Sequence, residues 1–121
     1  AEQVEGVYII SVAARILDMH PQTLRKYERL GLINPGRTIG MLRLYSRDDI
    51  RKVRLIQHLV NNLGMNLAGV EHTLGMVESL LRMRQRLANY AQSQPQTAHM
   101  KEAVEQELAR VFQEMDLPVD D

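Results

Sequence analysis

The stretch from residue 11 to residue 46 constrains the fold of this chain more than any other part. Ser11 has the side chain of an N-cap and precedes a short helical pattern, whose inward residues are expected to be Val12, Ala13, Ile16 and Leu17. The pattern breaks at residues 18–20. Pro21 suits the first turn of a second helix, because its missing N–H costs nothing there, and Gly31 supplies the left-handed residue after that helix. Two short helices joined by a tight turn are therefore predicted.

Turn-forming residues follow the second helix. Asn34, Pro35 and Gly36 are typical of a turn, and Gly40 marks another tight point between residues 37–39 and 42–45, which are expected to pair as a short hairpin. Ser46 and Asp49 resemble a capping box with Asp in place of the usual Glu. They begin a third helix, whose apolar face is predicted to contain Ile50, Val53, Ile56, Val60 and Leu63. This order of elements is that of a winged helix-turn-helix.

The second half of the chain has a different helical pattern. Gly64 ends the third helix and Asn66 caps a fourth. From residue 76 apolar residues alternate spacings of four and three, as in a coiled-coil seam, until Pro95 interrupts the pattern. The seam, proposed for dimerisation, consists of Met76, Leu80, Met83, Leu87 and Tyr90. We expect a mainly α fold, with a DNA-binding domain at residues 1–75 and a helical dimerisation region at residues 76–121.

Two arrangements of this seam are compatible with the pattern. The helix could pack on the winged domain of its own chain, or it could form an antiparallel coiled coil with a second chain. The second is favoured, because two recognition helices must be placed on one duplex, about one helical turn or a multiple of it apart. The stretch after Pro95 could fold back on the dimer or offer an apolar surface to a partner.

Charge is divided unevenly along the chain. The formal net charge is +0 over 121 residues, but it is +4 for residues 1–66 and −4 for residues 67–121. The basic half is typical of a surface that meets a polyanion. No apolar run is long enough to span a membrane and no signal peptide is evident, so a cytoplasmic protein is expected.

The composition argues against a metal or redox centre. The absence of Cys excludes a thiolate metal site and a Cys nucleophile. The four His residues lack ligand spacing, and His20 is interpreted as a cap or packing residue. No nucleophile–base pair, carboxylate pair or phosphate loop is evident, so we expect no enzyme activity, cofactor or metal.

The second helix carries the residues expected to bind DNA. Leu24 and Tyr27 fall on the side that faces the first helix. The opposite side carries Gln22, Arg25, Lys26 and Arg29, with Thr23 at its edge. Gln and Arg can read base edges bidentately, whereas Lys more often meets phosphate as a point charge. An ordinary solvated basic face is the alternative. Arg37 and Arg43 in the loop favour DNA, because both are expected to project beyond the domain and contact phosphates.

These motifs resemble the MerR superfamily of bacterial transcription regulators. The resemblance rests on the runs VAARILDMHPQTLRKYERLGLI, RLYSRDDI and LGMNLAGVEHTL, and covers residues 8–76. HPQTLRKYERLGLI followed by GMNLAGVE is similar to the heat-shock repressor branch, HspR. The resemblance implies a bacterial, nucleoid-associated homodimer that binds an inverted repeat in double-stranded DNA and represses chaperone operons, with the chaperone DnaK as co-repressor.

The resemblance also assigns roles to individual residues. It implies that recognition-helix contacts fall on Gln22, Thr23, Arg25 and Lys26. It implies that Tyr27 packs within the domain and reaches a phosphate, that Arg37 begins the wing, and that Arg43 and Tyr45 are the wing arginine and the wing tyrosine. The wing tip at residues 39–42 is more apolar than is usual in this superfamily.

Two rival functions remain open. A ligand-responsive MerR-type activator would need an effector pocket, for which the residues after the winged domain are too few. An adaptor that binds a chaperone through its C-terminal helices would lack DNA affinity.

Overall fold

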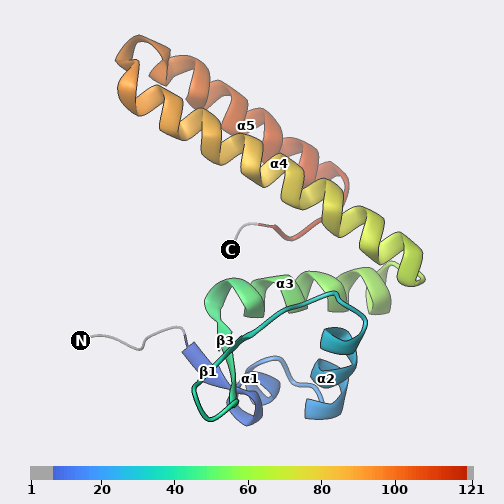
Figure 1. Cartoon of the computed structure of the whole chain (residues 1–121). Coiled ribbons are helices and arrows are strands. Elements are labelled where there is room, and N and C mark those ends of the chain that lie inside the picture. Colours follow the sequence, from blue (N-terminus) through green and yellow to red (C-terminus); the bar gives the residue numbers. More distant parts are fainter. Residues whose placement is uncertain (1–6, 120–121) are drawn as a thin grey trace. The chain divides into compact units, whose positions relative to one another are not determined.

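The computed structural model describes residues 7–119 and divides after residue 57 into two compact units, which are described separately. The fold is mainly helical, as predicted (Figure 1). The elements of the first unit are β1 (Val7–Ile9), α1 (Ile10–Ile16), α2 (Pro21–Arg29), β2 (Gly36–Arg37), β3 (Arg43–Ser46) and α3 (Arg47–Gln57). Those of the second are η1 (His58–Asn62), α4 (Leu67–Ser93), η2 (Pro95–Thr97) and α5 (Ala98–Glu114).

A small antiparallel sheet supports the first unit. Its strand order is β1-β3-β2, with Tyr8 opposite Tyr45 and Arg37 opposite Arg43. The predicted hairpin is therefore confirmed, and β1 adds a third strand. Strand β2 ends at Arg37 rather than at residue 39, because Met41 N donates to Thr38 O at 2.9 Å and closes a turn. Helices α1 and α3 both contact β3, the central strand.

The start of α1 differs from the prediction. The helix begins at Ile10 directly after the strand, with Ile9 as its N-cap and no side-chain capping bond. Ser11 lies inside the first turn and is exposed, so the prediction of Ser11 as the cap is wrong. The reason is that β1 pairs through Ile9, which faces Leu44, and carries the chain straight into the helix. The buried residues are Ala13, Ala14 and Leu17, whereas Ile16 is exposed.

The turn between α1 and α2 is fixed by hydrogen bonds at both helix ends. His20 Nδ1 accepts a hydrogen bond from Gln22 N at 3.0 Å, which confirms His20 as the N-cap of α2. Gly31 has a φ of 79°, the left-handed conformation predicted after this helix. Gln57, at the end of α3, donates from Nε2 to Leu17 O at 3.1 Å. The turn is thereby tied to α3, and α2 is held in one orientation within the unit.

The predicted capping box of α3 is confirmed. Asp49 N donates to Ser46 Oγ at 3.0 Å, and Ser46 N donates to Asp49 Oδ2 at 2.9 Å. The prediction of the apolar face of this helix is correct only as far as Ile56. The following turn, η1, is a π-helix in which Leu63 N donates to His58 O at 3.1 Å. Its extra residue shifts the face, so Leu59 is buried while Val60 and Leu63 are exposed.

The second unit is a helical hairpin. Asn66 Oδ1 accepts from Gly69 N at 2.9 Å and caps α4, as predicted. Helix α4 runs without interruption through residues 75 and 76, where the sequence suggested a functional boundary, and that boundary stays a prediction. Figure 1 shows α5 running back along α4, with η2 at the reversal. The buried residues of this unit are Leu59, Val70, Leu74, Val77, Ala91, Leu108, Phe112 and Leu117. No helix within residues 7–119 is long and apolar enough to cross a membrane.

Candidate nucleic-acid interface

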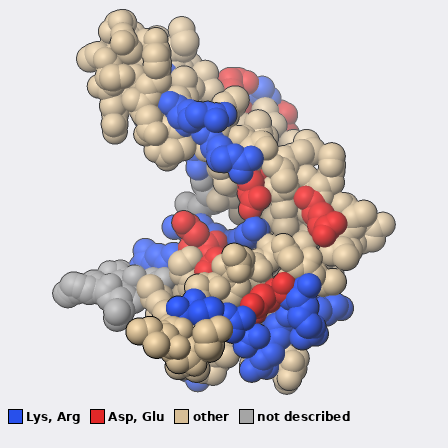
Figure 2. Space-filling view, viewed as in Figure 1, with Lys and Arg blue, Asp and Glu red and all other residues tan. Residues whose placement is uncertain are grey.

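Helix α2 has one buried and one charged face. Leu24 is fully buried, which fixes the rotation of the helix about its axis. On the opposite side Gln22, Lys26 and Arg29 are exposed, and Thr23 and Arg25 are partly exposed. Figure 2 shows Lys and Arg side chains gathered on the part of the first unit that carries α2. Exposed N–H donors of this kind suit the base edges and phosphates of a major groove.

Tyr27 lies at the border of this face. Its side chain is half-buried, and burial raises the pKa of its hydroxyl. The backbone carbonyl of Tyr27 accepts from Leu32 N at 3.0 Å, so the same residue closes the C-terminal turn of the helix. Packing within the domain, one of the two roles implied for Tyr27, is consistent with this placement.

The hairpin formed by β2, β3 and the loop between them is here called the wing. The tip of the wing is apolar and exposed. Ile39, Met41 and Leu42 are all exposed. The backbone turn is closed by Met41 N and Thr38 O, and Thr38 Oγ1 accepts from Leu42 N at 3.1 Å. Met41 has a φ of 69°, a conformation that favours Gly, whereas Gly40 does not have a positive φ. The strained position of the wing is thus Met41, one residue after the glycine.

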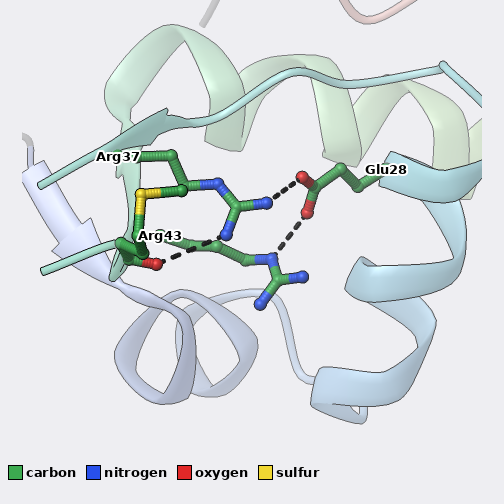
Figure 3. A network of polar contacts seen from close by, with 4 residues as sticks. Glu28, Arg37 and Arg43 are labelled. Atoms are coloured by element: carbon green, nitrogen blue, oxygen red, sulfur yellow. Dashed lines mark hydrogen bonds and ion pairs between the residues drawn. The ribbon is translucent and has the colours of Figure 1, made fainter.

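A single carboxylate connects α2 to the wing (Figure 3). Glu28 Oε1 accepts a hydrogen bond from Arg43 Nε at 2.6 Å, and Glu28 Oε2 accepts from Arg37 Nη2. Arg37 Nη1 also donates to Met41 O at 3.4 Å. The hydrogen bond from Arg43 is the largest cause of a lowered pKa of the Glu28 carboxyl, and the Glu28 carboxylate in turn raises the pKa of Arg43.

The sequence did not predict this network. It suggested that both wing arginines project beyond the domain. Instead both guanidinium groups are held against α2, with side chains 32% and 28% exposed for Arg37 and Arg43. The available signal was Glu28 itself, the one acidic side chain among the residues of α2. A lone carboxylate on a basic face attracts the nearest unpaired cations.

Tyr45 lies in the core rather than on the surface of the wing. Its side chain is 0% exposed, and its buried hydroxyl has no hydrogen-bond partner among residues 7–119. Burial is the largest cause of its raised pKa, and the negative charge of Glu28 adds to it. In this conformation Tyr45 packs the wing onto the unit and does not offer its hydroxyl to a ligand.

The seam residues of α4 remain largely uncovered. Met76, Met83 and Tyr90 are 45%, 42% and 55% exposed, and Leu80 and Leu87 are partly exposed. A shallow groove of about 620 Å³ runs beside the start of the seam and is lined by Glu71, His72, Gly75, Met76, Ser79 and Leu80. Helix α5 packs against α4, whose buried residues between positions 76 and 93 are Val77 and Ala91 rather than the seam residues.

A family model, a curated relative and two solved structures are similar to this chain. A family model described as MerR HTH family regulatory protein matches residues 8–76. A Streptomyces coelicolor protein, provisionally assigned as heat shock protein HspR, is 45% identical over 85 residues, which are 70% of this chain and 56% of that protein. This chain thus spans little more than half the length of that relative.

Two solved structures share the fold. One is HiNmlR, a MerR family regulator lacking the sensor domain, bound to promoter DNA. It has a TM-score of 0.55 and 23% identity, and the match covers 91% of this chain and 79% of the other. The second is a MerR family transcriptional regulator from Bacillus cereus, with a TM-score of 0.55 and 25% identity over 91% and 78% of the two chains.

Proposed function

Because this chain belongs to the MerR HTH family of regulatory proteins, we propose that it is a sequence-specific DNA-binding repressor of heat-shock genes. The observation that carries the proposal is the exposed polar and basic face of α2, fixed by the buried Leu24 on the other side of the helix. Gln22 and Arg25 are proposed to read base edges, and Lys26 and Arg29 to contact phosphates. The similarity to the Streptomyces coelicolor protein supports the heat-shock assignment.

We also propose that the protein acts as a dimer through the seam on α4. The seam has heptad spacing, and its Met76, Met83 and Tyr90 side chains are exposed in the single chain. Burying such a stripe against a second copy removes apolar surface from water. A two-fold dimer presents two α2 helices to two halves of an inverted repeat, which is the form of operator proposed here.

DnaK is proposed as the co-repressor, on the resemblance to the heat-shock repressor branch alone. In this scheme misfolded protein occupies DnaK and so relieves repression. The described surface offers two exposed apolar side chains to a partner, Met100 on α5 and Met115 directly after that helix.

A gel-shift titration on an inverted-repeat promoter fragment at two salt concentrations tests DNA binding. The expected result is a shifted complex that weakens steeply as salt rises, because phosphate contacts release counterions. Footprinting with and without DnaK then tests the co-repressor. Absence of a shift at low salt would refute the DNA-binding function, and binding of DnaK without DNA affinity would favour an adaptor instead. A footprint that is unchanged by DnaK would refute only the co-repressor.

A further inference from the structure

We propose that Glu28 is a positioning residue for DNA binding, and that it gives the two wing arginines different tasks. Arg43 is held ready to bind a DNA phosphate, whereas Arg37 braces the wing and does not contact DNA. This inference rests on the DNA-binding function proposed above and deepens it. The first observation is that Glu28 joins α2 to the wing through both of its oxygens, one for each arginine.

The two arginines use different nitrogens. Arg37 uses both terminal nitrogens within the domain, Nη2 toward Glu28 and Nη1 toward Met41 O. Arg43 donates to Glu28 through Nε alone. Its two terminal nitrogens have no hydrogen-bond partner among residues 7–119, and Figure 3 shows them directed away from the carboxylate. A guanidinium has five N–H donors, so four of those on Arg43 remain for a ligand.

The free edge of Arg43 has the geometry that an oxyanion needs. Paired terminal N–H groups bind two oxygens of a phosphate at once, and this bidentate contact is stronger than a contact with a single point charge. Because Glu28 holds Nε, the guanidinium plane is fixed before DNA arrives. An arginine side chain that is not held loses rotamer entropy on binding, and the ion pair with Glu28 lowers that cost.

Glu28 also offsets repulsion inside the wing. Arg37 and Arg43 occupy directly opposite positions on β2 and β3, where like charges destabilise a strand pair. The pKa of the Glu28 carboxyl is lowered, chiefly by the hydrogen bond from Arg43, and the group is ionised at neutral pH. The three groups together carry a single positive charge, which remains attractive to phosphate.

An opposite role for Glu28 is physically reasonable and predicts the opposite result. A carboxylate near DNA repels phosphates, so a Glu28 that only neutralised the arginines would weaken binding. Replacing it would then raise affinity. The sign of the change in affinity therefore separates positioning from inhibition.

The test uses fluorescence anisotropy of the full chain with one labelled duplex, selected from a random-sequence library by the wild-type protein. Affinities are measured over a range of salt concentrations for Glu28→Gln, Arg43→Ala and Arg37→Ala. Glu102→Gln, which removes the same charge from an exposed position on α5, is the matched control. Circular dichroism checks that each variant is folded.

We expect Glu28→Gln to lower affinity for the duplex by about tenfold. This loss corresponds to the entropy cost of ordering one or two long side chains on binding. Arg43→Ala should lower the slope of log K against log salt by about 0.9, the loss of one phosphate contact. Arg37→Ala should weaken binding and leave the slope unchanged, and Glu102→Gln should not weaken it.

Three results would overturn the proposal while leaving DNA binding intact. These are higher affinity for Glu28→Gln, unchanged affinity for Glu28→Gln, and equal salt slopes for Arg37→Ala and Arg43→Ala. If the library yields no duplex that the wild type binds at low salt, the proposed function and this inference both fail.

Discussion

Arg37 and Arg43 lie directly opposite each other across β2 and β3, and both donate hydrogen bonds to Glu28 on α2. One carboxylate therefore connects α2, which is proposed to read DNA, with the wing, which is proposed to bind DNA phosphates. Since α2 is also tied through its preceding turn to α3, the DNA-facing elements of the first unit form one connected set. Their mutual geometry is set before any ligand binds.

Glu28→Gln is expected to destabilise the protein at neutral pH but not in acid. The pKa of the Glu28 carboxyl is lowered in the folded chain, so its stabilisation is present above the unfolded value, about 4.3 for glutamate, and is lost as the pH falls through the folded pKa. Urea unfolding of both proteins at pH 7 should show a difference of up to about 1 kcal/mol, which shrinks as the pH is lowered below the unfolded pKa of glutamate. An equal difference at neutral and at acidic pH would contradict the ion-pair assignment.

Met41→Gly is expected to stabilise the wing. Met41 has a φ of 69° and an exposed side chain, so the substitution relieves backbone strain and loses little packing. A non-glycine residue in this conformation costs about 1–2 kcal/mol, part of which the greater freedom of Gly in the unfolded chain offsets. Thermal unfolding should therefore show a gain of about 0.5–1 kcal/mol. Ile39→Gly, at an exposed position without a positive φ, is the control and should not stabilise.

Tyr45→Phe is expected to stabilise the first unit. The substitution removes a buried hydroxyl that has no hydrogen-bond partner among residues 7–119 and retains the buried ring. Leaving such a group unpaired costs about 1 kcal/mol or more. Denaturant unfolding should show a gain near that value, whereas Tyr8→Phe at a partly exposed position outside the seam should show none. A loss of stability would mean that the Tyr45 hydroxyl does bond in solution.

Met83→Glu is expected to dissociate the proposed dimer. Met83 is in the middle of the seam and exposed in the single chain, so a carboxylate there would be buried without a partner in the two-chain coil. Sedimentation equilibrium should show a dimer for the wild type and a shift toward monomer for Met83→Glu. Gln85→Glu places the same charge at an exposed position of α4 outside the seam and should leave the dimer intact. A monomeric wild type would refute the seam as a dimer interface.

Features set by a few neighbouring residues could be predicted from the sequence. The Ser46–Asp49 capping box, the Asn66 cap and the left-handed Gly31 each depend on contacts within four residues, and all three are confirmed. The order of helix, turn, helix and hairpin followed from the same local signals. The resemblance of whole motifs to the MerR superfamily is confirmed by the family model, which matches residues 8–76.

Features set by distant contacts could not be predicted. Glu28 meets arginines nine and fifteen residues away, and that meeting depends on how the wing folds back onto α2. The π-helical turn at His58–Asn62 changes which apolar side chains are buried, and no residue type in that segment predicts such a turn. Ser11 has the right chemistry for a cap, but the pairing of β1 through Ile9 starts the helix too early for it.

The central claim is that the outer face of α2 reads DNA sequence, and Arg25→Ala tests it most directly. Anisotropy titrations would compare the wild type, Arg25→Ala and Lys26→Ala on the selected duplex and on a scrambled one, with Arg86→Ala on α4 as the control for lost charge. Arg25→Ala should lower affinity for the selected duplex by about 1–3 kcal/mol and reduce discrimination against the scrambled one. Lys26→Ala should weaken both duplexes alike and lower the salt slope by about 0.9. Undiminished discrimination by Arg25→Ala, or no preference of the wild type for the selected duplex, would contradict the account.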